Sequence, residues 1–173
     1  AVGSPASNPS GVGTPVTLTY SFLSASPPYL QEPGVRAFDP VERAASQQAL
    51  ATIGSMVGVS FQEIIGIGQF TFAMSAQNPA QGGFAFIPSY AYSTNVSNLI
   101  SSVTESAESG DVWLNAAVAW VNADWQPGGD GYATLLHEIG HGLGLKHPFE
   151  PVQNGFLLAT SLDNERYTVM SYT

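Results

Sequence analysis

The chain has 173 residues, of which 44% are hydrophobic and 10% charged, so it can form one domain with a sizeable core and is too hydrophobic for a disordered protein. Its 13 acidic residues outnumber 4 basic ones, and the net charge of −9 argues against nucleic acid and membrane surfaces as partners. The absence of cysteine excludes a disulfide framework, a thiolate metal site and a cysteine nucleophile.

The N-terminal residues differ in composition from the rest of the chain. Residues 1–15 are rich in Gly, Ser, Pro and Asn and show no hydrophobic periodicity, which predicts a flexible leader. Apolar side chains then alternate with Thr and Ser from Val16 to Phe22, the period expected of a strand with one buried face. We therefore expect a single folded domain over 16–173 that begins with this strand.

The residues around Pro40 match the start of a helix. Asp39 is a good N-cap, Pro40 occupies the first helical position, and Glu42 stands three residues after the cap. Apolar residues at helical spacing continue the pattern, and Gly58 is a candidate for the left-handed residue that ends a helix. The sequence predicts a helix over about 40–57.

Short runs rich in β-branched and aromatic residues follow this helix. They predict strands at 59–64, 70–74, 83–87 and 112–115. The segment 89–110 is rich in Ser, Thr and Asn, and its composition leaves a long loop or a short helix open.

All three histidines of the chain fall in one motif, His137-Glu138-x-x-His141-x-x-Gly144-x-x-His147. Residues four apart lie on one face of a helix, so the first two imidazoles can point at a single ion about 2 Å from each. Gly144 permits a sharp left-handed turn that brings His147 back as a third ligand. An isolated pair of histidines four residues apart usually occurs by chance on a helix surface, but five specified residues at fixed spacing favour a zinc site.

The donor set also indicates what kind of zinc site this is. Three neutral nitrogens leave the fourth position of a tetrahedral ion open for water, as in catalytic rather than structural sites. Glu138 follows His137 directly and would reach that water rather than the metal. Leu135, Ile139 and Leu143 lie on other sides of the helix and would pack it into the core.

The motif resembles that of the metzincin metalloproteases, and His147-Pro148 resembles the serralysin branch, secreted bacterial enzymes of peptidase family M10. The run Tyr167-Thr-Val-Met-Ser-Tyr172 resembles the methionine turn of that branch. The resemblance implies that Met170 forms a hydrophobic floor under the zinc. It also implies that Tyr172 is an extra ligand that swings away to stabilise an oxyanion. Taken singly, Met170 would be an ordinary core methionine.

The resemblance also implies a fold. This is an α+β, metzincin-like (zincin) catalytic domain with a twisted, mixed five-stranded sheet, an antiparallel edge strand, a backing helix and an active-site helix. In such a fold the edge strand pairs with an extended substrate, and the matching residues here are Gly83, Phe84, Ala85 and Phe86. An ordinary edge strand blunted by Pro88 is the alternative.

The function that follows is a secreted, zinc-dependent endopeptidase that acts on extended protein or peptide substrates, with Glu138 as general base. Two alternatives remain open. One is a catalytically silent zinc-binding adhesion or scaffold module of a larger secreted protein, which would not need Glu138. The other is a zinc hydrolase that acts on an amide or ester outside proteins.

The sequence departs from the serralysin pattern at its C-terminal end. Serralysins continue past the methionine turn into a helix and calcium-binding repeats, whereas this sequence ends at Thr173. We therefore expect a catalytic domain truncated just after the methionine turn, with its own missing C-terminal segment as a candidate partner. Calcium could bind Asp130, Asp163 and Glu165, although solvated loop charges are the favoured interpretation of these carboxylates.

Overall fold

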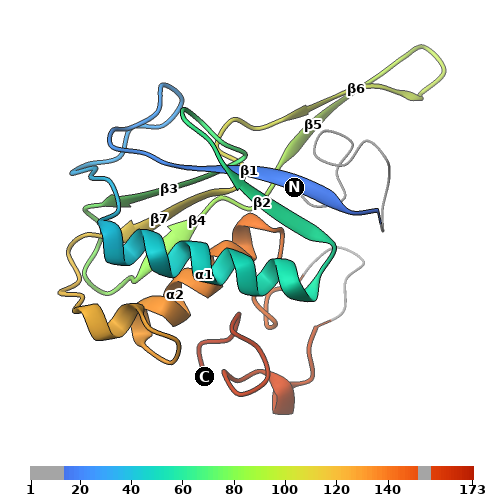
Figure 1. Cartoon of the computed structure of the whole chain (residues 1–173). Helices are drawn as coiled ribbons and strands as arrows, with labels where there is room; N and C mark the ends of the chain where they lie inside the picture. Colours follow the sequence, from blue (N-terminus) through green and yellow to red (C-terminus); the bar gives the residue numbers. More distant parts are fainter. Residues whose placement is uncertain (1–13, 152–156) are drawn as a thin grey trace.

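The computed structural model describes residues 14–151 and 157–173, so nearly all of the expected leader at 1–15 lies outside the described residues. Figure 1 shows the helices and strands of this part of the chain. In chain order they are β1 (Val16–Phe22), α1 (Pro40–Met56), β2 (Val59–Glu63), β3 (Phe70–Ser75), β4 (Gly83–Ala85), β5 (Tyr90–Thr94), β6 (Ile100–Glu105), β7 (Asp111–Asn115), the 3-10 turn η1 (Asn122–Trp125), α2 (Asp130–Gly142) and the 3-10 turn η2 (Thr160–Leu162).

The main sheet has five strands in the order β2-β1-β3-β7-β4. β1 pairs in parallel with β2 and with β3, and β3 pairs in parallel with β7. β4 is antiparallel to β7, with Phe84 opposite Trp113, and it lies at the edge of the sheet. The predicted mixed sheet with an antiparallel edge strand is confirmed, although β4 is shorter than the 83–87 expected.

The central strand β3 is buried on both faces, with every residue from Phe70 to Ser75 inaccessible to solvent. Phe70 and Phe72 belong to the core cluster that also contains Leu135 and Ile139 of α2. On the other face, Thr71 donates a hydrogen bond to Asp111 at the start of β7. Continuous burial of this kind is typical of parallel strands covered on both sides.

Helix α1 begins as the sequence predicts. The Asp39 carboxylate accepts hydrogen bonds from the backbone N–H groups of Val41 and Glu42, and the Glu42 carboxylate accepts one from the Asp39 N–H. The expected left-handed stop at Gly58 is wrong, because Gly58 is not among the residues with positive φ. Val57 instead ends the helix in an extended conformation, since the chain passes directly into β2.

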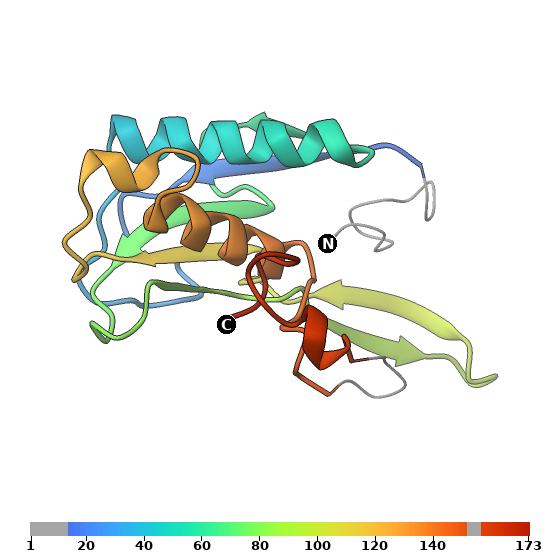
Figure 2. The ribbon, with the colours of Figure 1, turned by 90° about the horizontal axis from the view of Figure 1, so that it is seen from below.

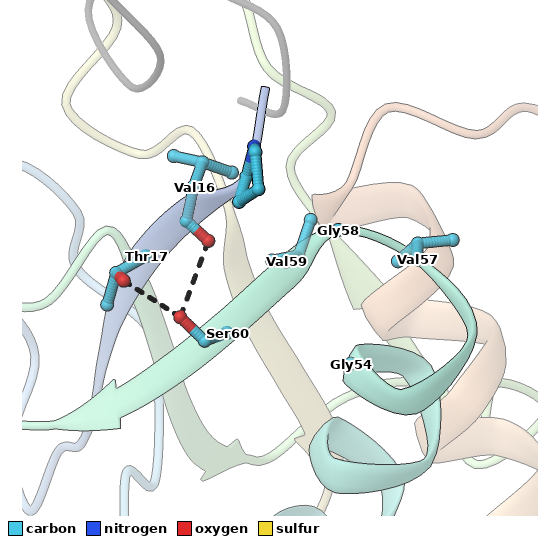
Figure 3. A pocket seen from close by; sticks show the side chains of 8 residues that line it. Val16, Thr17, Gly54, Val57, Gly58, Val59 and Ser60 are labelled. Carbon is cyan, nitrogen blue, oxygen red and sulfur yellow. Dashed lines mark hydrogen bonds between the residues drawn. The ribbon is translucent and has the colours of Figure 1, made fainter. Parts of the chain in front are cut away.

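Both helices cover the same face of the sheet (Figures 1 and 2). α1 packs on β2, whereas α2 packs on β7 and β4 at the opposite edge. A shallow pocket lies where the end of α1 meets β1 and β2, lined by Val16, Gly54 and Ser60 among others (Figure 3). The pocket is therefore separated by the width of the sheet from β4, the strand at the opposite edge. None of the described helices is long and apolar enough to cross a membrane.

The segment 89–110 forms neither the loop nor the helix that composition left open. β5 and β6 form an antiparallel hairpin that projects from the body of the molecule (Figure 2). At its turn, the Asn95 side chain accepts hydrogen bonds from the N–H groups of Ser97 and Leu99, and Asn98 has a φ of 58°. Most side chains of both strands are exposed, and Ser101 and Ser102 interrupt the hydrophobic alternation of β6 where the pairing register shifts, so the sequence signal for these strands is weak.

Candidate metal centre

Helix α2 holds the first two histidines by packing against the sheet. Leu135 and Ile139 are fully buried in the core, whereas His137 and His141 lie on another side of the helix and are each 7% exposed. The helix approaches β3 closely at Gly142, where a Cβ would lie 2.6 Å from the Phe70 ring. The hydrophobic spacing of α2 therefore fixes the direction of both imidazoles.

The turn after α2 follows the prediction made from Gly144. This residue has a φ of 98°, and its N–H donates to the His141 carbonyl. The next N–H, of Leu145, donates back to the Gly140 carbonyl, which closes the end of the helix. The reversal carries the chain back so that His147 reaches the imidazoles of α2.

The three histidines meet through their Nε2 atoms, each of which lies 3.1 Å from the other two. Every Nδ1 faces an oxygen that can only accept a hydrogen bond. His137 donates to the Val169 carbonyl at 2.7 Å, and His141 donates to the Leu145 carbonyl at 2.9 Å. His147 donates to the Glu150 carboxylate at 2.9 Å.

These partners determine where the protons are. With its proton on Nδ1, a histidine has a lone pair on Nε2, so Nε2 atoms that face one another in this way cannot be mutual hydrogen-bond donors. Burial also lowers the pKa of His137 and of His141, which favours the neutral form. Three converging nitrogen acceptors suit a cation placed between them.

The geometry suits a small divalent metal. A point about 2 Å from all three Nε2 atoms, the usual Zn–N distance, lies just off the plane of their triangle and leaves one side open. In the two described ranges, this is the one group of three or more His, Cys, Asp or Glu side chains that could hold a metal ion. Asp130, Asp163 and Glu165 form no such group there, and Asp163 accepts a hydrogen bond from the Ser171 hydroxyl.

Glu138 lies between the histidines and the edge strand. Its side chain is buried, and its Oε2 has no hydrogen-bond partner among the described residues. Burial raises the pKa of Glu138 to about 7. A Cβ at Gly83 of β4 would lie 3.3 Å from the Glu138 Cγ, so the strand passes directly beside this carboxyl group.

The C-terminal residues bring Met170 and Tyr172 to the histidines. Met170 is buried, and its Sδ would lie 2.5 Å from a Cβ at Gly140 of α2, so it packs closely against the helix that carries the ligands. The Tyr172 hydroxyl donates to the His147 Nε2 at 2.5 Å, and its ring stacks on that of His137. Tyr172 is nevertheless 64% exposed.

The four residues expected to bind substrate, 83–86, lie at the edge of the sheet in different surroundings. Gly83 lies beside Glu138, whereas the Phe84 ring stacks on Trp113 of β7. Ala85 lies in β4, and Phe86 extends the ladder because its N–H donates to the Asp111 carbonyl. In the described chain no strand pairs with the outer edge of β4, so contact between this edge and a substrate stays a prediction.

Sequence reasoning missed the groups that orient the imidazoles. Glu150 could have been found, since it is an acidic residue three positions after His147 and its hydrogen bond to that ring lowers its pKa. The carbonyls of Leu145 and Val169 carry no sequence signal. Asn115 was also missed; it is fully buried and donates to the carbonyls of Asn78 and Gln81, in the loop that leads into β4.

A helix bearing HExxH under an antiparallel edge strand, with a glycine turn that returns a third histidine, is the arrangement expected of a metzincin-like domain. The chain is 30% identical to the serralysin of a Photorhabdus species over 90% of its length, and 26% identical to the metalloprotease AprA of Pseudomonas entomophila over 91%. The serralysin of Proteus mirabilis is 25% identical over 93% of the chain. The chain is therefore homologous to serralysin-type metalloproteases, which confirms the resemblance carried by its motifs.

The chain spans about a third of the length of these relatives, 32% of the first two and 34% of the third. No family model matches it. Among solved structures, that of myroilysin has a TM-score of 0.44 and 13% sequence identity, and the match covers 76% of this chain and 49% of the other.

Proposed function

We propose that the chain is the catalytic part of a zinc-dependent endopeptidase. The observation that carries this proposal is the set of three converging Nε2 lone pairs beside a buried carboxyl group, Glu138, with one unpartnered oxygen. A structural zinc site would have no need of that carboxyl group. The relatives named as metalloproteases support the same function.

The residues present fit a zinc ion. His137, His141 and His147 would hold it through Nε2, and their Nδ1 partners keep the rings oriented for this. When bound, zinc supplies Lewis acidity, which lowers the pKa of water and polarises a carbonyl group. Met170 supports α2 by packing against it at Gly140.

Glu138 would carry the proton in peptide hydrolysis. As a carboxylate it accepts a proton from the attacking water, and it then delivers that proton to the nitrogen of the leaving amine. Its burial suits both roles, because a pKa of about 7 lets the group give and take a proton near neutral pH.

Tyr172 would stabilise the negative charge that develops on the carbonyl oxygen of the substrate. Its hydroxyl already lies at the histidine centre, 2.5 Å from the His147 Nε2, and its exposed ring has room to move. A hydroxyl donor directed at the developing oxyanion lowers the barrier to attack.

The substrate would bind as an extended chain along β4. The backbone groups of Phe86 pair inward with Asp111 and Gly110, so by the alternation of an antiparallel strand those of Gly83 and Ala85 face the outer edge of β4. An added antiparallel strand would use these outward groups beside Glu138. Backbone pairing selects for extended conformation rather than for particular side chains.

The family resemblance favours a place of action outside the cell.

The deciding experiment measures zinc content and hydrolysis of casein in the wild type, in Glu138→Gln and in His141→Ala. We expect the wild type and Glu138→Gln to bind one zinc each, with a loss of hydrolysis of about a thousandfold in Glu138→Gln, within the usual range for a general base. His141→Ala should lose zinc as well as activity. Zinc binding in the wild type without hydrolysis would instead support a silent zinc-binding module.

A further inference from the structure

The hairpin β5–β6 is a continuation of the edge strand. Past β4, the Phe86 N–H donates to the Asp111 carbonyl and the Gly110 N–H donates to the Phe86 carbonyl, both at 2.9 Å. After Pro88 the pairing resumes, because the Ser106 N–H donates to the Ser89 carbonyl at 2.9 Å and leads into β5–β6. β4 and β5 therefore form one side of a long antiparallel ribbon that extends beyond the body of the molecule (Figures 1 and 2).

The two faces of this hairpin differ in polarity. On one face, Tyr92 is opposite Val103 and Thr94 is opposite Ile100. On the other face, Ser93 is opposite Ser102, and their hydroxyls are hydrogen-bonded. Tyr92 is 60% exposed and Ile100 is 62% exposed, so nothing in the described chain covers the outer part of the apolar face. A two-stranded hairpin normally needs its apolar face packed against something.

The position of the active site relative to the ribbon indicates what could bind this face. Gly83 is the residue of β4 beside Glu138, so it marks the point nearest the bond to be cleaved. Antiparallel pairing is the more stable arrangement, and it would place the substrate residues upstream of that bond alongside the residues that follow Gly83. Tyr92 stands nine positions further along the chain, about 30 Å away at the rise of an extended strand.

The chemistry of the hairpin limits the kind of substrate segment it would accept. The hairpin has one charged residue, Glu105 at its base, whose carboxylate accepts a hydrogen bond from the Tyr90 hydroxyl, and residues 90–104 carry no charge although the net charge of the chain is −9. Binding there would depend on the outer edge of β5 at residues 91–94, with which no described strand pairs, and on apolar contacts with Tyr92 and Ile100, rather than on ion pairs.

We propose that β5–β6 is a second substrate-binding segment, which holds the apolar, extended part of a polypeptide about seven to eleven residues upstream of the cleaved bond. This inference rests on the proposed endopeptidase function. Binding at the hairpin would make the enzyme prefer long substrates, because a short peptide reaches the histidine centre but not the hairpin.

The test uses three synthetic peptides with one cleavable core of six residues. One is the core alone, the second adds ten upstream residues with apolar side chains at alternate positions, and the third adds the same ten downstream. The variant is the double substitution Tyr92→Ser and Ile100→Ser, and the matched control is Thr104→Ala on the opposite face.

For the wild type we expect kcat/KM to be about tenfold higher for the upstream-extended peptide than for the core. The double variant should lose this gain while it cleaves the core normally, which also shows that it is folded. Fluorescence anisotropy with the labelled upstream-extended peptide should show correspondingly weaker binding to the double variant than to the wild type or Thr104→Ala.

Equal kcat/KM for the core and the upstream-extended peptide, or the same gain from the downstream extension, would overturn the proposal. Failure of the wild type to cleave any peptide would contradict the endopeptidase function instead, and the anisotropy comparison would still decide whether the hairpin binds the peptide. Sedimentation showing a wild-type dimer that the double variant loses would assign the apolar face to self-association and reject the proposal.

Discussion

The candidate site joins two regions that are held in different ways. In the body of sheet and helices, His137, Glu138 and His141 stand on α2 and are buried, because apolar side chains on the same helix pack into the core. In the loops after Gly144, His147 and Tyr172 are oriented mainly by hydrogen bonds and ring stacking. The first region therefore depends on close packing, and the second on a few polar contacts that solvent can reach.

The largest effect should come from crowding the body at Gly142. In Gly142→Ala the new Cβ would lie 2.6 Å from the fully buried Phe70 ring, so α2 or β3 must shift. We expect the free energy of unfolding to fall by about 1–3 kcal/mol, as measured by urea denaturation.

Gly144, in the turn just after α2, provides the control for Gly142→Ala. A Cβ at Gly144 would meet nothing within 4 Å, so Gly144→Ala strains only the backbone at its φ of 98°. We expect a smaller loss of about 1 kcal/mol for this variant. A larger loss for Gly144→Ala than for Gly142→Ala would contradict the idea that packing dominates the body.

The body should also show a pH-dependent stability that originates at Asp111. Burial raises the pKa of this carboxyl group to about 6, with a smaller contribution from Glu108, although Thr71 and Tyr29 donate hydrogen bonds to it. Because the folded pKa lies above the unfolded value, the contribution of Asp111 to stability is complete below about pH 4 and is lost as the pH rises through about 6.

The substitution Asp111→Asn should remove this dependence. The difference in unfolding free energy between wild type and variant should shift in favour of the variant by on the order of 1–3 kcal/mol between pH 4 and pH 8. Urea denaturation at several pH values measures it. A difference that does not change with pH would show that Asp111 has an ordinary pKa.

In the loops, Tyr172→Phe removes only the hydroxyl group. We expect kcat to fall about ten- to a hundredfold with little change in KM, because the lost hydrogen bond acts on the developing charge. The ring is mostly exposed, so the free energy of unfolding should stay the same. An unchanged kcat would remove Tyr172 from the catalytic group.

A modest effect is expected at Glu150, which would act on a bound metal through His147. Glu150→Gln keeps an acceptor for the His147 Nδ1–H but removes the negative charge. Zinc affinity should weaken about tenfold, as measured by competition with a chromogenic chelator. Glu165→Gln, at an exposed position of the same region, is the matched control and should leave the affinity unchanged.

The parts of the fold that could be predicted are those with a local signal. The caps of α1, the ligand spacing on α2 and the turn at Gly144 each depend on residues close together in sequence. The hairpin β5–β6 could not be predicted, because consecutive serines and a shift in pairing register interrupt its short hydrophobic period. The carbonyl partners of His137 and His141 could not be predicted either, because every residue type has a backbone carbonyl.

The spacing of the ligands has a consequence for folding. All three lie within the eleven residues from His137 to His147, so ion binding requires only one helix and one turn, a structure of very low contact order. The surroundings of Glu138 and His137 depend instead on Gly83 and Val169, which are distant in sequence and meet them only when the chain is fully folded. If the three histidines bind zinc as proposed, a partly unfolded chain would retain the ion after these distant contacts are lost, and zinc content would overestimate the fraction of native protein.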